Sequence, residues 1–200
     1  MTSFHMTGDE SADALLASDD NALLAGMCLD QQIPMEKAFA GPAVIAERMQ
    51  GRFDVEAIAR MDEGDFVELC ARKPAVHRFP GAMGARLYQL CTVLVEDYDG
   101  QAANLWGDGD GKQVLARLKK LPGFGDQKAR IFLALLGKRR GLEAKGWQQA
   151  AGEYGEPGFR SVADITDEES LLKVRETKKA VKAQAKAAAA RTKQEQEKQE

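Results

Sequence analysis

Apolar residues recur at helical spacing along almost the whole chain. In the stretch GARLYQLCTVLV, Leu87, Leu90, Cys91, Leu94 and Val95 fall on one face of a helix. β-Branched residues are sparse, and no segment alternates apolar and polar positions for long enough to indicate a strand. The pattern therefore predicts an all-α protein.

Polar residues and prolines mark where some of these helices begin. Ser18, Asp19 or Asp20 can cap a helix that carries the apolar stripe of NALLAGMCL. Proline is favoured in the first turn of a helix, so Pro34 and Pro42 each predict the start of a further short helix.

The two ends of the chain differ from its middle. Residues 1–10 have no apolar periodicity, and we expect them to be disordered. From residue 171 the composition becomes Lys, Ala, Gln and Glu without an aromatic residue, so a helix there has little to bury. This basic tail, 171–200, is either solvated and frayed or an arm that adds phosphate contacts. Residues 11–170 are predicted to form one helical domain.

Positive charge is concentrated in two segments of a chain whose net charge is −3. Residues 1–111 have a balance of −11, whereas residues 112–140 have a balance of +8. The balance is −5 over residues 141–170 and +5 over residues 171–200. Because local rather than net charge attracts a polyanion, an acidic body with a basic segment is compatible with binding to nucleic acid.

Other classes of protein are less compatible with the sequence. The longest apolar run, residues 131–136, is too short to cross a membrane, and the N-terminus has no leader-like pattern, so we expect a cytoplasmic protein without a membrane partner. Cys28, Cys70 and Cys91 form no CxxC pair and lie among apolar neighbours, which predicts buried thiols rather than a metal framework.

The basic segment surrounds a glycine-containing turn, PGFG, at residues 122–125. Gly123 and Gly125 permit a tight reversal between two helices, and Phe124 can insert between them. The second helix then begins near Asp126, where its first backbone N–H groups lack partners and its dipole is positive. Such a helix start binds anions, and the basic residues around it suggest a row of phosphates: Lys119, Lys120, Lys128, Arg130 and 138–140.

The stretch LPGFGDQKA resembles the helix-hairpin-helix signature, with Ala129 at the small-residue position between the helices. The stretch LLAGMCLDQQIPMEKA, residues 23–38, resembles the first core helix of the helix-hairpin-helix-GPD superfamily of base excision repair glycosylases, the endonuclease III and adenine-glycosylase group. A helix start at Gly84-Ala85-Arg86 also fits. The resemblance covers roughly residues 20–140 and implies an endonuclease III-like helical fold.

The resemblance also implies a double-stranded DNA partner and base flipping, in which the target nucleotide leaves the stack. In that family a glutamine at the end of the first core helix fills the vacated space, which implies Gln32 here, with Gln31 beside it. In the same family the amides of the hairpin hold the DNA backbone, and its carbonyls often hold a monovalent cation. We expect a nucleoid-associated monomer that contacts DNA through Gln31, Gln32, Lys120, Gly123, Phe124, Gly125, Gln127, Lys128 and Arg130.

The sequence departs from the family pattern at three places. The lysine that forms a Schiff base in bifunctional members corresponds to Gln127, and Lys128 is about 100° further round the helix, so we expect Lys128 to contact phosphate. The family's aspartate should lie near residues 143–147, where Glu143 is the only acid; Asp164 is a second candidate. The four-cysteine iron–sulfur site is missing, so no cofactor is expected.

Three functions therefore remain open. The first is a monofunctional DNA glycosylase, a hydrolase that uses Glu143 or another carboxylate to help release a damaged base. The second is a helix-hairpin-helix module that binds DNA without catalysis, and the third is a helical adaptor for other proteins. Trp106 and Trp147 either stack on a flipped base or close the core.

Overall fold

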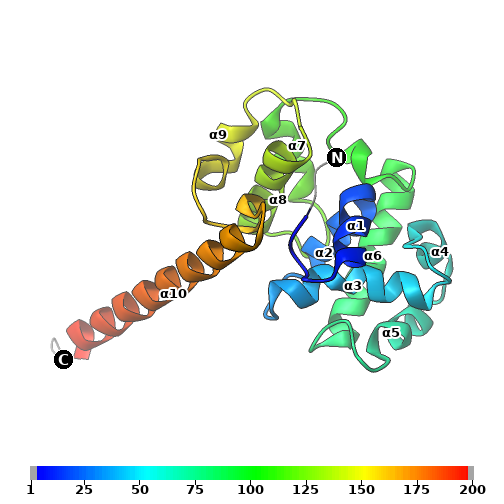
Figure 1. Cartoon of the computed structure of the whole chain (residues 1–200), viewed down its shortest axis with the longest axis horizontal. Helices are drawn as coiled ribbons and strands as arrows, with labels where there is room; N and C mark the ends of the chain where they lie inside the picture. Colours follow the sequence, from blue (N-terminus) through cyan, green and yellow to red (C-terminus); the bar gives the residue numbers. More distant parts are fainter. Residues whose placement is uncertain (1–3, 198–200) are drawn as a thin grey trace.

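The computed structural model describes residues 4–197, and within the last helix it describes side chains up to Gln184 and that of Ala187. In this part of the chain there are helices and no strand, which confirms the all-α prediction (Figure 1). No helix among the described residues is long and apolar enough to cross a membrane. The α-helices are α1 (Glu10–Ser18), α2 (Asp20–Leu29), α3 (Met35–Arg48), α4 (Val55–Arg60), α5 (Glu63–Ala71), α6 (Pro80–Tyr98), α7 (Gly111–Leu118), α8 (Asp126–Arg139), α9 (Trp147–Ala151) and α10 (Glu168–Glu197), and the short 3₁₀ helices are η1 (Ala102–Leu105), η2 (Gly152–Gly155) and η3 (Val162–Asp164).

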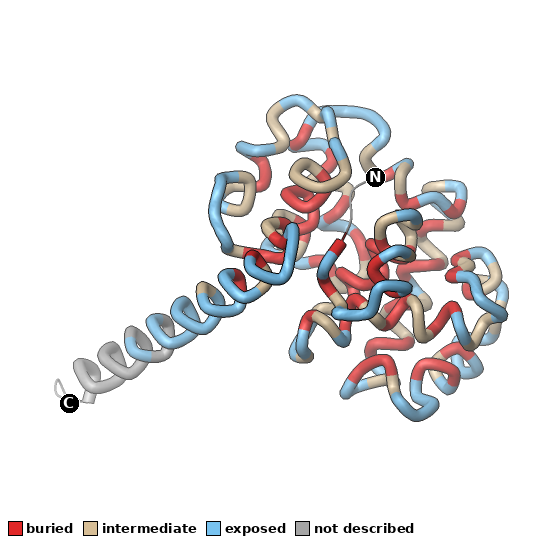
Figure 2. The backbone as a smooth tube through the Cα atoms, viewed as in Figure 1, coloured by how far each residue is buried: buried red, intermediate tan, exposed pale blue. Residues whose placement is uncertain are grey.

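Two groups of helices share one hydrophobic core. Helix α6 packs against α4 and α5, and α2 packs against α3, whereas α8 packs against α7, α9 and η3 (Figure 1). Buried backbone runs through both groups (Figure 2). Phe39, Phe66 and Phe132 are among its largest fully buried side chains. The three cysteines are buried in the same core, as the sequence predicts.

The start of α2 follows the prediction, and α3 departs from it. The carboxylate of Asp19 accepts hydrogen bonds from the amides of Asn21 and Ala22, so Asp19 is the N-cap. Pro34 precedes α3, but Pro42 lies inside this helix and does not start a second one. A proline inside a helix costs about 3 kcal/mol. Burial of residues on both sides of Pro42 offsets this cost by keeping the helix packed on α2.

Residues 4–10, which the sequence predicts to be disordered, are packed in the structure; residues 1–3 lie outside the described part. Phe4 and Met6 are buried. The carboxylate of Asp13 accepts hydrogen bonds from the amides of Met6 and Thr7, at 3.0 and 3.1 Å. The segment therefore folds back on α1, because two apolar side chains and one buried carboxylate together fix it.

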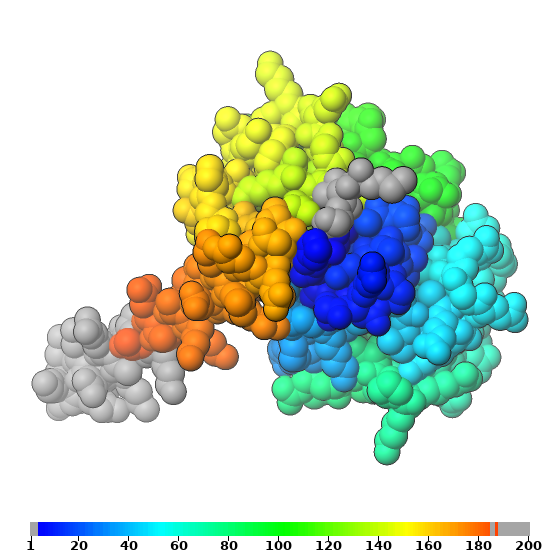
Figure 3. All heavy atoms as spheres, in the orientation of Figure 1, coloured from blue at the N-terminus to red at the C-terminus, as the bar shows by residue number. Residues whose placement is uncertain are grey.

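Helix α10 begins on the body and then extends away from it (Figures 1 and 3). Its first turns are attached through Ser170 and Val174, which are buried. Further along, Arg175 forms an ion pair with Glu36 on α3. The predicted tail therefore begins as a packed helix, and its described residues beyond Arg175 are mostly exposed.

Candidate nucleic-acid interface

Helices α7 and α8 are joined by residues 119–125, which include the predicted turn at 122–125, and α8 begins at Asp126 as predicted. Gly123 has a φ of 81°, which favours glycine. Phe124 is buried and packs edge-on against Phe132, with the ring centroids 6.0 Å apart. Ala129 is fully buried.

The turn leaves several backbone amides open. The amide of Phe124 donates to the carbonyl of Leu121 at 3.1 Å. The amides of Gly123, Gly125, Asp126 and Gln127 have no acceptor among residues 4–197, and Gly125 provides no side-chain cap. Residues 125–127 are exposed. This end of α8 is thus a group of solvent-facing N–H donors at the positive end of a helix dipole.

The basic side chains around the turn are unequally available. Lys119 and Arg130 each contact the carboxylate of Asp126 at 2.7 Å. The hydrogen bond from Lys119 lowers the pKa of Asp126 most, and the hydrogen bond from Arg130 lowers it further. The two cations outnumber the one carboxylate, and Lys120 is exposed beside them. The side-chain amide of Gln127 donates to the Tyr154 hydroxyl at 2.9 Å, so Gln127 is already engaged.

The end of α2 is held in place by a buried histidine. Nε2–H of His77 donates to the carbonyl of Gln31 at 2.8 Å, while Nδ1 accepts from the amide of Phe79 at 3.0 Å. Burial, the largest cause, lowers the pKa of His77 and favours this neutral ring. The residue is only 1% exposed, because its loop folds over the end of α2.

Arg86 joins the end of α2 to the hairpin turn. Its guanidinium donates to Oε1 of Gln31 at 3.0 Å. Its aliphatic stem lies so close to Gly123 that a Cβ at that position would be 2.5 Å from Cδ of Arg86. Residues from three distant parts of the sequence therefore meet at one surface. Helix α6 starts at Pro80, earlier than the expected start at Gly84, which places Arg86 in its second turn.

Gln32 is presented to solvent beside this contact. Its backbone has a φ of 58°, a value that residues other than glycine adopt rarely. The residue is also exposed. Its side chain has no hydrogen-bond partner among the described residues, whereas Gln31 is held at both its carbonyl and its side chain. Strained backbone on a surface is often found where a residue has a functional position.

Lys128 points into the protein instead of toward the solvent in front of the hairpin. Its Nζ donates to the carbonyl of Cys28 at 2.8 Å, close to where Cys28 Sγ contacts the carbonyl of Pro122. Burial lowers the pKa of Lys128. The predicted phosphate contact therefore does not match the observed direction of this side chain, which instead fastens α8 to the end of α2.

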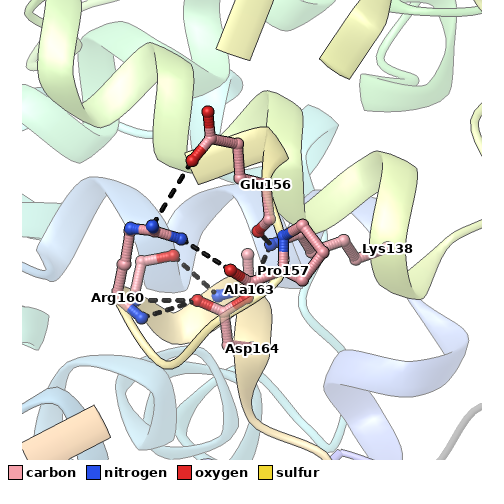
Figure 4. Close-up of polar contacts among 7 residues, drawn as sticks. Lys138, Glu156, Pro157, Arg160, Ala163 and Asp164 are labelled. Carbon is pink, nitrogen blue, oxygen red and sulfur yellow. Dashed lines mark hydrogen bonds and ion pairs between the residues drawn. The ribbon is translucent and has the colours of Figure 1, made fainter. Parts of the chain in front are cut away.

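The two acids suggested by the sequence lie away from the turn. Glu143 follows the other end of α8, and 14 helical residues correspond to about 20 Å. Asp164 lies beside the last turn of α8, where its carboxylate contacts Lys138 Nζ at 2.6 Å (Figure 4). The carboxylate also accepts hydrogen bonds from the amides of Arg160 and Ser161. Neither acid meets Gln31.

Both tryptophans take part in packing. Trp106 meets Phe132 edge-on with ring centroids 5.8 Å apart. Trp147 lies against Gly137 so closely that a Cβ there would be 2.4 Å from its indole. Both are partly buried against the core, and the structure thus agrees with the core interpretation of these residues.

Asp30, at the C-terminal end of α2, is a charged residue that the sequence analysis did not single out. It follows α2 directly, and burial raises the pKa of its carboxyl group, with Lys178 and Lys128 acting in the opposite direction. Its carboxylate accepts no hydrogen bond from any described residue. Its position directly before Gln31, at the end of a predicted helix, could have indicated it from the sequence.

Among the described residues no group of three or more His, Cys, Asp or Glu side chains is arranged to hold a metal ion. Comparison of the chain with family models, with curated proteins and with solved structures gave no match.

Proposed function

We propose that this protein binds double-stranded DNA through the α7–α8 hairpin and acts in base excision repair as a monofunctional DNA N-glycosylase. The observation that carries the proposal is the Arg86 contact, which brings Gln31 and the turn at Gly123 to one surface. An enzyme that acts on a base within a duplex needs a grip on the backbone and a group that replaces the extruded base, side by side.

The hairpin has the features of the grip. Open amides at residues 125–127 and the exposed Lys120 offer hydrogen bonds and positive charge to a phosphate without reading the base sequence. Gln32, exposed and without a partner among the described residues, is the side chain best placed to enter the duplex. Its amide group can hydrogen-bond to the base left unpaired opposite the extruded one.

A DNA-binding module without catalytic activity is the second candidate. The position of Glu143 favours it, because this acid lies at the opposite end of α8 from the turn. Such a module would bind duplex DNA with the same hairpin and release no base. The adaptor hypothesis predicts negligible DNA binding at about 0.1 M salt, where phosphate contacts still contribute.

Binding can be tested by fluorescence anisotropy with a labelled duplex over a range of salt concentrations. Lys120→Ala should weaken binding and reduce the magnitude of the salt dependence by about one unit of log K against log salt. Lys145→Ala is the matched control, because Lys145 is an exposed lysine past the far end of α8. Equal effects of the two substitutions would contradict the proposed interface.

Catalysis can be tested with duplexes that carry uracil, alkylated purines or oxidised bases, followed by alkali to cleave at abasic sites. A glycosylase gives strand cleavage with at least one substrate. Binding that depends on Lys120 without cleavage of any substrate would support the non-catalytic module instead.

A further inference from the structure

The carboxylate of Asp30 differs from those of the aspartates that cap the N-terminal ends of helices. Five of them accept hydrogen bonds from backbone amides in the first turn of a helix and so have a structural role: Asp9, Asp19, Asp54, Asp62 and Asp110. Asp30 follows the C-terminal end of α2, where the helix dipole is negative and a carboxylate is unfavourable. Its backbone amide closes the helix, and its side chain has no part in this.

The surroundings of Asp30 bring cations near without pairing with it. Lys128 approaches from α8 but donates to the carbonyl of Cys28. Burial raises the pKa of Asp30, Lys178 on α10 lowers it, and Glu36 on α3 raises it. No ion pair within 4.0 Å involves Asp30 among the described residues. A partly buried carboxylate that lacks donors destabilises a fold, so packing does not account for it.

Asp30 also lies two residues before Gln32, the side chain proposed to enter DNA. Gln31 follows it directly, with its carbonyl fixed by His77 and its side chain by Arg86. The backbone of residues 30–32 is further tightened by the amide of Gln31, which donates to the carbonyl of Leu29 at 2.7 Å. Asp30 and Gln32 are therefore attached to the same rigidly held turn.

From this placement we infer that Asp30, not Glu143, is the catalytic carboxylate for base release. The inference rests on the proposed function and names the acid within that site. Its ligand is the deoxyribose of an extruded nucleotide, which becomes positively charged as the base departs. Lys128 is then a positioning residue, because it holds the start of α8 against the end of α2.

The reaction is a hydrolysis. The bond between C1′ and the base nitrogen breaks, and its electron pair leaves with the base, which takes a proton from solvent. The negative charge of Asp30 stabilises the resulting cationic sugar. A water oxygen then bonds to C1′ and gives one proton to Asp30, which returns it to solvent.

The first test compares Asp30→Asn with Glu143→Gln in the base-release assay on the full chain. Removal of a catalytic acid or base should slow release by about 10²–10⁴-fold, and Glu143→Gln should remain within about threefold of the original protein. A full rate for Asp30→Asn beside an active original protein would overturn the inference while leaving the proposed function intact.

The second test needs no turnover. A duplex that carries a protonated pyrrolidine in place of one deoxyribose is compared with a duplex that carries the neutral tetrahydrofuran analogue. We expect the original protein and Glu143→Gln to bind the cationic analogue at least tenfold more tightly, and Asp30→Asn to bind both alike. Circular dichroism and binding of an undamaged duplex show whether Asp30→Asn is folded and retains its hairpin contacts.

The two tests separate the possible failures. Absence of base release by the original protein on every substrate counts against the proposed catalysis, and the cation preference then still decides whether Asp30 faces the extruded sugar. A preference that persists in Asp30→Asn, or none in the original protein, overturns the assignment.

Discussion

Replacement of Gly123 with alanine perturbs the contact between the hairpin turn and the end of α2. At a φ of 81° an L-residue costs about 1–2 kcal/mol relative to glycine. The new Cβ would also lie 2.5 Å from Cδ of Arg86. The arginine side chain can move away, but it then loses its exposed hydrogen bond to Gln31, worth about 0.5 kcal/mol. We expect the free energy of unfolding to fall by about 2 kcal/mol, which corresponds to a Tm lower by about 4–8 °C.

Gly141→Ala is the matched control. Gly141 has a φ of 67°, and a Cβ there would meet nothing within 4 Å. It follows the far end of α8, so its substitution reproduces the backbone strain without the Arg86 contact. Both variants should unfold at lower temperature in scanning calorimetry. Only Gly123→Ala should weaken binding of a labelled duplex, because it releases Gln31.

A double-mutant cycle with Arg86→Ala isolates the contact. Without the arginine stem the alanine at position 123 has no clash, so the two substitutions should be coupled by at least about 0.5 kcal/mol. The reasoning is refuted if Gly123→Ala costs the same in both backgrounds and leaves DNA affinity equal to that of Gly141→Ala.

Three further predictions concern packing and charge. Gly137→Ala should lower the Tm in calorimetry, because the new Cβ would lie 2.4 Å from the Trp147 indole. Overpacking of this kind costs about 1–3 kcal/mol, which exceeds the roughly 1 kcal/mol that alanine gains over glycine in a helix. A higher Tm would contradict this prediction. Asp164→Asn should cost about 3–5 kcal/mol in urea unfolding, because it removes the charged partner of the mostly buried Lys138 and leaves this cation only the carbonyl of Glu156. A cost below about 1 kcal/mol would show that the ion pair is dispensable. Asp30→Asn should raise the Tm near pH 7.5. The pKa of Asp30 is raised in the folded state, so ionisation of this group opposes folding. The gain in Tm should therefore be full above the folded pKa and shrink as the pH falls toward about 4. A gain that does not change with pH would argue against this charge effect.

Local patterns in the sequence were sufficient for much of the helical structure. The cap at Asp19, the buried face of α6 and the start of α8 near Asp126 each depend on residues within one or two turns of one another. Pro42 is an exception, since a local rule predicted a helix start there and the packing of α3 outweighed it. Such rules fail where distant residues supply the stabilising contacts.

The candidate site was only partly accessible from sequence. The turn between α7 and α8 was predicted, and Gln31 was proposed as a DNA contact, because their residue types have local meanings. Asp30 and the direction of Lys128 were not, because each depends on contacts between residues about 100 positions apart in the chain. Burial, which turns Lys128 inward and raises the pKa of Asp30, is a property of the packed molecule and has no short-range signature.

The sequence by itself determined an all-helical chain with a basic, glycine-containing hairpin, because helical periodicity, capping and turn formation act over a few residues. Only the tertiary structure decided that Arg86 joins Gln31 to Gly123, that His77 is buried beneath this contact, and that Glu143 lies at the opposite end of α8. The physical reason is that relative positions of helix ends follow from how side chains fill the common core, which involves the whole chain at once.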